Sequence, residues 1–197
     1  MQILSKYNDN FLKALAQLNE NQLEAVNRIE GPVLVIAMAL VCTPQLLIAD
    51  EPTTALDVSI QAQIISLLRR LCKDHGAAVM LVTHDMGVIA ETCDRVAVMY
   101  AGRIVEIGPV ASVIHAPAHP YSAGLMGSIP AMDEDRERLL QIDGAMPRLT
   151  AIPRGCAFNP RCPRVFDRCR VERPELLDAG DTRAACWLHD STFEKAA

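Results

Sequence analysis

Residues 46–52 read Leu-Leu-Ile-Ala-Asp-Glu-Pro, four apolar residues followed directly by two carboxylates. Such an apolar run is typical of a strand buried in a sheet, and the two acids would emerge at its carboxyl end. In open α/β sheets this edge is where ligands bind. A carboxylate there can hold Mg²⁺, and a neighbouring glutamate can polarise the water that attacks a γ-phosphate. The stretch therefore predicts an α/β protein with half of a nucleotide site.

The other half of such a site is a glycine-rich loop with a lysine, of the form G-x-x-x-x-G-K-[ST]. The sequence has no match to this pattern. Its lysines are Lys6, Lys13, Lys73 and Lys195, and none of them follows a glycine. From these residues we expect the chain as written to bind ATP weakly or not at all.

The composition favours a globular cytoplasmic protein. Half of the 197 residues are apolar, but the longest apolar run, residues 33–42, is too short to span a bilayer, and residues 1–10 have no signal-peptide core. A net charge of -5 produces no overall field that attracts nucleic acid, so we expect no nucleic-acid partner. The seven cysteines are an odd number, and in a reducing compartment they do not indicate a disulfide framework.

The pattern around residues 46–52 continues as a strand–helix–strand unit. Asp57 can cap a helix whose apolar stripe ends before Gly76, and a second buried strand follows at residues 78–82. Such a crossover makes the two strands parallel, and we expect both faces of the sheet to be covered. At the end of this sheet we expect a hairpin around Ala101-Gly102, and then helical turns at residues 110–115 and 121–128.

The composition divides the chain into four parts. We expect residues 1–35 to form a helical amino-terminal segment, and residues 36–130 carry the α/β pattern. Residues 131–154, which are charged and contain prolines, are interpreted as a linker, and residues 155–197 are a small cysteine-rich extension.

A histidine follows the second predicted strand. Thr83 comes directly after the strand, and His84 and Asp85 come next. Because the carboxyl ends of parallel strands meet at one edge, His84 can reach the γ-phosphate that Asp50 and Glu51 address. A lone histidine at a strand end is more often a surface or capping residue, so this interpretation depends on the neighbouring acids.

Three runs of sequence closely resemble the ATP-binding subunits of ABC transporters. They are IAMAL at 36–40, LLIADEPTTALDVSIQAQII at 46–65 and VMLVTHDMGVIAETCDRVAVMYAGRIVE at 79–106. The resemblance implies a partial P-loop NTPase sheet. It also implies that Asp50 is the Walker B acid, Glu51 the catalytic base and His84 the switch histidine. Asp57 closes the D-loop, which in that family touches the partner subunit.

The sequence that follows narrows the resemblance to dipeptide and oligopeptide importer ATPases, over residues 36–190. It is carried by HPYSAGL at 119–125, SIP at 128–130 and GCAFNPRCP at 155–163. The family implies ATP and Mg²⁺ as cofactors. It also implies transmembrane permease subunits and a second ATPase subunit as partners, at the inner face of the cell membrane.

The cysteine-rich extension contains Cys156, Cys162, Cys169 and Cys186, spaced C-x5-C-x6-C-x16-C. Thiolates this close in sequence can converge on one soft metal centre, and nearby arginines would help to keep them deprotonated. The resemblance points to a [4Fe-4S] cluster, with zinc as the alternative occupant. Free thiols in a loosely ordered tail are the plainer interpretation.

The amino-terminal part departs from the ABC pattern, because the glycine-rich loop, the glutamine loop and the LSGGQ-type signature are absent before residue 36. Residues 18–37, LNENQLEAVNRIEGPVLVIA, instead resemble the amino-terminal segment of UvrD-like helicases, and Gln22 matches the glutamine that reads adenine in that family.

Three hypotheses follow. The chain is the ATPase subunit of a peptide importer, truncated or chimeric and represented by its carboxyl-terminal half. Alternatively, it is a catalytically silent interaction module with an iron–sulfur or other metal centre, or, more distantly, a helicase fragment. Whether it acts as an enzyme depends on whether ATP binds.

Overall fold

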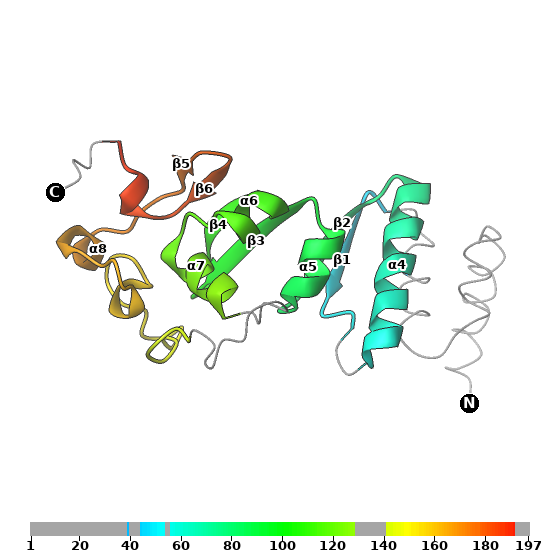
Figure 1. Ribbon diagram of the computed structural model, residues 1–197, viewed down its shortest axis with the longest axis horizontal. Coiled ribbons are helices and arrows are strands. Elements are labelled where there is room, and N and C mark those ends of the chain that lie inside the picture. The colour runs from blue at the N-terminus through cyan, green and yellow to red at the C-terminus, as the bar shows by residue number, and fades with distance from the viewer. Residues whose placement is uncertain (1–38, 40–43, 54–55, 129–140, 192–197) are drawn as a thin grey trace, which may run out of the picture. The chain divides into compact units, whose positions relative to one another are not determined.

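The computed structural model describes residues 39, 44–53, 56–128 and 141–191. The chain forms two compact units, residues 1–88 and 89–197 (Figure 1). The helicase-like segment 18–37 and Gln22 lie outside the described residues. The domain boundaries expected from composition, after residues 35, 130 and 154, stay predictions.

The first unit contains the parallel strand–helix–strand core. Its elements are β1 (Leu46–Asp50), α4 (Val58–His75) and β2 (Ala78–Val82). The strands pair in parallel, with Leu46 opposite Ala78 and Asp50 opposite Val82. The predicted α/β class and the predicted crossover are both confirmed.

Helix α4 begins and ends where the sequence predicted. The backbone N–H of Ile60 donates to Asp57 Oδ1 at 2.9 Å, so Asp57 caps the first turn. At the other end Gly76 adopts φ +64°, and its N–H donates to the carbonyl of Lys73 at 3.4 Å. Glycine reaches this left-handed conformation without a Cβ penalty, and for this reason it commonly ends helices.

The core of the first unit is formed by Leu47 of β1 with Ile64 and Leu68 of α4, all of them buried. The expectation that both faces of the sheet are covered is wrong in the described structure, because Leu46 and Ile48 are 51% and 59% exposed. Successive side chains of a strand point to opposite faces, and α4 packs on the face that carries Leu47.

The second unit contains a four-stranded antiparallel sheet in the order β3-β4-β6-β5. Its strands are β3 (Arg95–Tyr100), β4 (Arg103–Pro109), β5 (Leu177–Ala179) and β6 (Thr182–Ala184). The predicted hairpin is confirmed: Ala101 and Gly102 have φ of +47° and +76°, as a two-residue hairpin turn of the primed type requires. The hairpin was expected at the end of the parallel sheet, but it belongs to a separate sheet. There β4 pairs with β6, which comes from the cysteine-rich tail, residues 155–191.

Short helices complete the described structure. They are α5 (Met86–Thr92), α6 (Val110–His115), α7 (Pro120–Gly127), α8 (Asp167–Val171) and two 3-10 turns, η1 (Asn159–Arg161) and η2 (Trp187–His189). The helical turns expected at 110–115 and 121–128 are confirmed, whereas α5 and the elements of the tail were not predicted.

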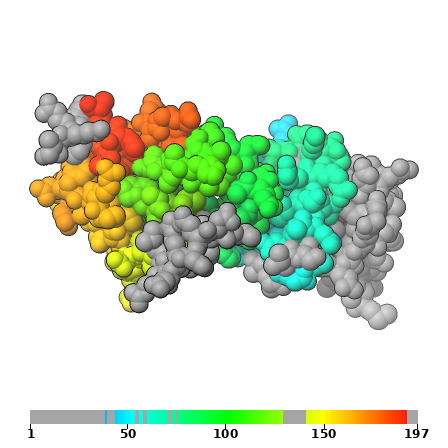
Figure 2. Space-filling model, viewed as in Figure 1, coloured from blue at the N-terminus to red at the C-terminus, as the bar shows by residue number. Residues whose placement is uncertain are grey.

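The tail is an integral part of the second unit. Phe158 is 2% exposed and packs in one hydrophobic cluster with Tyr100 of β3 and Val113 of α6. In Figure 2 the orange and red tail residues form a continuous surface with the green residues of the same unit. The interpretation of residues 155–191 as a loosely ordered tail is therefore wrong.

We expect Leu68→Ala to lower the free energy of unfolding by about 2 to 5 kcal/mol, because it removes buried methyl groups and leaves a cavity between α4 and β1. Lys73→Ala, at an exposed position of the same helix, should change it by less than about 0.5 kcal/mol. Urea titrations followed by far-ultraviolet circular dichroism compare the two. Equal, small effects would contradict this packing.

Candidate functional site

The first candidate site lies at the carboxyl edge of β1 and β2. Asp50 is the last residue of β1 and is exposed. Glu51 follows with φ +43°, a left-handed conformation that is uncommon outside glycine, and its N–H donates to the carbonyl of Val82 at 2.8 Å. Such backbone strain costs about 1–3 kcal/mol and concentrates at functional sites.

His84 lies against Glu51, as the parallel topology led us to expect. The Nδ1 atom of His84 is 3.0 Å from Oε1 of Glu51. The side chains are 83% and 46% exposed, so the contact contributes little to stability. The structure thus brings Asp50, Glu51 and His84 to one sheet edge, and Asp57 lies nearby in the chain as the cap of α4.

Asp85 is a residue of this edge to which the sequence assigned no role. Its Oδ1 accepts the backbone N–H groups of Gly87 and Val88 at 2.9 and 3.2 Å, which caps α5, and its Oδ2 accepts from Gln61 Nε2 at 2.8 Å. The bond from the Val88 N–H is the main cause of the lowered pKa of this carboxyl. The loop that carries His84 is thereby tied to α4. An aspartate directly before a helix was the signal that would have revealed the cap.

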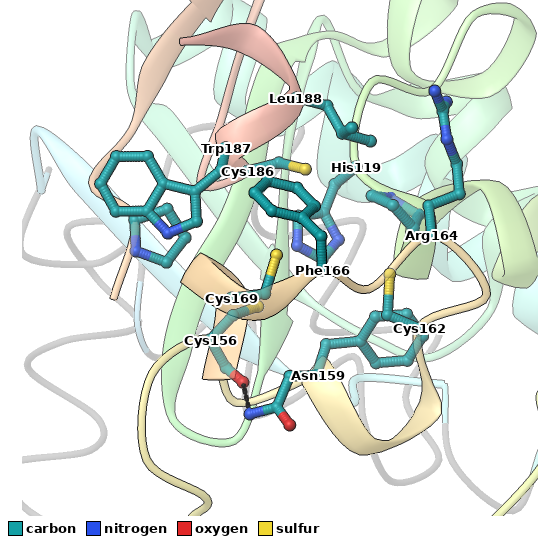
Figure 3. A pocket seen from close by; sticks show the side chains of 13 residues that line it. His119, Cys156, Asn159, Cys162, Arg164, Phe166, Cys169, Cys186, Trp187 and Leu188 are labelled. Atoms are coloured by element: carbon teal, nitrogen blue, oxygen red, sulfur yellow. Dashed lines mark hydrogen bonds between the residues drawn. The ribbon is translucent and has the colours of Figure 1, made fainter. Parts of the chain in front are cut away.

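The second candidate site is a small cavity in the second unit (Figure 3). Four cysteines line it together with Phe158, Phe166 and Trp187; they are Cys156, Cys162, Cys169 and Cys186. Cys156 and Cys162 flank η1, Cys169 lies on α8, and Cys186 precedes η2. The fold thus brings together all four cysteines that the spacing had singled out.

The thiols do not form a closed shell around a single ion. Within the described ranges, no three His, Cys, Asp or Glu side chains are placed so that they could hold one metal ion. The cavity measures about 10 Å³, room for about one water molecule. The donor set, four cysteines with no carboxylate in the lining, nevertheless fits an iron–sulfur cluster, in which each thiolate binds a different iron atom.

Backbone N–H groups point at three of the four sulfurs in a repeated pattern. The N–H of Phe158 is bonded to the Cys156 sulfur, that of Arg164 to Cys162, and that of Leu188 to Cys186, each two residues further along the chain. Such bonds favour the thiolate and tune the potential of a bound cluster. The pattern could not be recognised from residue types, because it is made by the main chain.

Burial acts in the opposite direction and outweighs these bonds. It raises the pKa of the Cys156 and Cys162 thiols and raises the pKa of Cys186 to about 11. Desolvation is the largest effect on Cys162, and Arg164 acts against it by lowering the pKa of this thiol, which is the direction expected of a nearby arginine. Binding of a metal here must release protons.

Gly155 allows the first cysteine to approach α8. The N–H of Cys156 donates to the carbonyl of Cys169 at 2.8 Å. Gly155 has φ +75°, and a Cβ atom on it would lie 2.3 Å from the same carbonyl oxygen. Only glycine fits both the backbone conformation and the available space.

Glu106 and His119 are two further residues that sequence reasoning missed. Both are buried, at 0% and 1% exposure, and His119 lines the cysteine cavity. Burial lowers the pKa of His119 to about 4, so the ring is neutral at physiological pH. The sequence HPY at 119–121 was noted only as part of a family resemblance and carried no chemical interpretation.

Comparisons with known proteins find relatives of this chain. Residues 105–169, from β4 into α8, match a family described as the oligopeptide/dipeptide transporter C-terminal region. The chain is 48% identical over 162 residues to the oligopeptide transport ATP-binding protein OppD of Haemophilus influenzae, covering 81% of this chain and 50% of that protein. It is 49% identical over 150 residues to the dipeptide transport ATP-binding protein DppD of Escherichia coli, covering 76% and 46%.

The chain thus spans about half the length of these relatives. Its similarity to ATP-binding proteins of peptide transport confirms the predicted resemblance to the ATP-binding subunits of peptide importers. A solved structure of cbiO1 from Clostridium perfringens, part of the ABC transporter complex cbiONQ, aligns with 55% of this chain and 47% of its own at 28% identity and a TM-score of 0.45. No helix in the described part is long and apolar enough to cross a membrane.

We expect the metal-free second unit to lose stability as the pH rises from about 9 to about 11. In this window the unfolded Cys186 thiol is ionised while the folded one keeps its proton, so the folded state binds more protons and stability falls with pH. The loss should reach about 2 kcal/mol. Urea titrations at about pH 8 and about pH 10.5 measure it, with reductant present.

The control is Cys186→Ala, which keeps every other alkaline titration, including that of Tyr121, whose pKa burial also raises. If Cys186→Ala loses as much stability between these two pH values as the parent does, the Cys186 thiol is not the cause of the loss.

Proposed function

We propose that this chain acts as the carboxyl-terminal part of the ATP-binding subunit of a peptide ABC importer. The observation that carries the proposal is the meeting of Glu51 and His84, at 3.0 Å, where parallel strands end. The identity of about 48% with peptide transport ATP-binding proteins supports it independently.

In this proposal each side chain at the edge has a separate task. Asp50 would hold the Mg²⁺ that accompanies ATP, which when bound would supply neutralisation of the charge on the phosphates. Glu51 orients and polarises the attacking water. His84, next to it, binds a γ-phosphate oxygen and keeps the Glu51 carboxylate oriented. Gln61 and Asp85 hold the His84 loop against α4.

The same proposal names the partners. Asp57, at the end of the D-loop, lies where the family contacts its second ATPase subunit, and transmembrane permease subunits complete the transporter. The chain would then work at the inner face of the cell membrane.

For the cysteine cavity we propose a [4Fe-4S] cluster held by Cys156, Cys162, Cys169 and Cys186. The all-thiol donor set and the N–H groups directed at three sulfurs support it. Zinc is the weaker alternative, because the described side chains do not converge tightly enough around one point to hold a single ion.

A silent interaction module is the second candidate function. The lack of a G-x-x-x-x-G-K-[ST] segment in the sequence favours it, because a triphosphate would lose most of its anchoring contacts. In this alternative the cysteine centre and the exposed sheet face serve only to bind transporter subunits.

The chain as written should show little or no ATP binding in calorimetry, with or without Mg²⁺, and no hydrolysis above background. Glu51 can activate water only against an anchored phosphate. Mg²⁺-dependent turnover that disappears in Glu51→Gln would contradict the silent module and show that the site is complete.

The catalytic roles are tested by fusing residues 44–191 behind the amino-terminal half of the Escherichia coli relative. We expect ATP hydrolysis by this chimera, and at least about a hundredfold loss in Glu51→Gln and in His84→Ala. A chimera that hydrolyses ATP equally well with either substitution would contradict the assigned roles.

Anaerobic reconstitution with iron and sulfide should produce one four-iron cluster per chain with visible charge-transfer absorption. Cys162→Ser should abolish it. Cys93→Ser should not, because Cys93 lies outside the cavity, next to Thr92. Metal analysis with no stoichiometric iron or zinc would rule out a metal centre.

A further inference from the structure

The turn that follows β2, residues 83–85, is shaped by hydrogen bonds between near neighbours. The N–H of Asp85 donates to Thr83 Oγ1 at 3.1 Å, and Asp85 Oδ1 accepts the N–H groups of Gly87 and Val88. Each of these bonds joins residues two or three positions apart. They therefore fix the internal shape of the turn, but they do not fix its position relative to α4.

Gln61 supplies the connection to α4. Its Nε2 donates to Asp85 Oδ2 at 2.8 Å, between residues 24 positions apart in the chain. The bond is partly buried, and hydrogen bonds to an ionised carboxylate are stronger than those between neutral groups. With donors on both of its oxygens, Asp85 is held between the start of α5 and the side of α4.

Gln61 is itself fixed by the first turn of α4. Its N–H donates to the carbonyl of Asp57 at 2.9 Å, and the Asp57 side chain caps the same turn through the N–H of Ile60. Because helical turns are held by such bonds, a displacement of Asp57 carries Gln61 with it. A short path thus leads from Asp57 through Gln61 to Asp85 and to His84 beside it.

The orientation of the His84 ring depends on this turn. The side chain is 83% exposed, so the turn that carries it decides where the ring lies, and Nδ1 lies 3.0 Å from Glu51 Oε1. Asp85 is a second carboxylate near the ring: the Val88 N–H is the main cause of its lowered pKa, and the charge of His84 contributes. Gln61 occupies the Asp85 oxygen that would otherwise compete with Glu51 for the ring.

We propose that Gln61 is a positioning residue that makes the contact between His84 and Glu51 depend on the first turn of α4. The hydrogen bonds that carry this dependence belong to the chain by itself. Its consequence rests on the function proposed above: Asp57 ends the D-loop, so a second ATPase subunit that touches this loop would act on His84 through Gln61.

The first test follows the His84 ring in the full chain by nuclear magnetic resonance, through the Overhauser cross-peak between the ring protons and the side-chain protons of Glu51. In Gln61→Ala we expect this cross-peak to fall about fivefold, as the loss of one hydrogen bond gives, because Asp85 Oδ2 is released and draws the ring away. Gln63→Ala, at an exposed position of the same helix, is the matched control and should leave the cross-peak unchanged.

A rescue experiment guards against indirect effects on folding. Gln61→Glu alone places two carboxylates together and should weaken the cross-peak. Combined with Asp85→Asn, it should restore the cross-peak, because the asparagine amide donates to the glutamate while its oxygen still accepts from Gly87 and Val88. Circular dichroism checks that each variant is folded. A cross-peak that is unchanged in Gln61→Ala, or that the double variant does not restore, would overturn the proposal.

The second test asks whether Asp57 reaches His84 through Gln61. Asp57→Ala removes the cap of α4 and should weaken the same cross-peak in the parent. In the Gln61→Ala background it should have little further effect, because the connection is already broken. Fully additive effects of the two substitutions would contradict the proposed path.

The consequence for catalysis is measured in the chimera with the amino-terminal half of the Escherichia coli relative. Gln61→Ala should lower kcat about five- to tenfold, as the loss of one hydrogen bond gives, with the KM for ATP nearly unchanged. An unchanged kcat would contradict the proposal. If the parent chimera does not hydrolyse ATP, the proposed function is wrong, while the cross-peak still decides whether Gln61 positions His84.

Discussion

The candidate nucleotide site at the sheet edge depends on one constraint, the parallel pairing of β1 with β2. Parallel strands cannot be joined by a tight turn, so the chain must cross over, and α4 provides this crossover with its apolar stripe packed on Leu47. The same pairing makes both strands end at one edge. Glu51 and His84, which lie 33 residues apart, therefore meet at 3.0 Å. Glu51 has a positive φ at this edge.

The second unit is organised around buried polar groups in addition to its aromatic cluster. Glu106 has no exposed surface, and its carboxylate is satisfied by two main-chain N–H groups and the hydroxyl of Thr182. Because a buried carboxylate is costly unless it is hydrogen-bonded, this arrangement allows few alternatives for the loop and for β6. The ordering of the tail is thus connected to the centre of the sheet.

Two opposing effects act on the pKa of the thiols that line the cysteine cavity. Burial favours neutral thiols and raises the pKa of Cys186 to about 11, whereas the N–H groups of the following residues favour thiolates. The apolar walls and the N–H groups are already in place in the metal-free chain. What a metal would have to supply is the free energy to remove the protons from these thiols.

Local sequence by itself determined the elements whose signals are local. The apolar run at 46–49, the cap Asp57, the stop at Gly76 and the Ala101-Gly102 turn each specify their own few residues, and all were predicted correctly. The cysteine spacing likewise identified the four thiols that line one cavity. Tertiary structure alone decided that β6 joins β4, that one face of the parallel sheet is exposed, and that the buried Glu106 carboxylate accepts the backbone N–H of His119. These three features depend on how segments far apart in the chain pair with one another and exclude water. Neither periodicity nor residue type indicates which distant backbone groups will face a buried side chain.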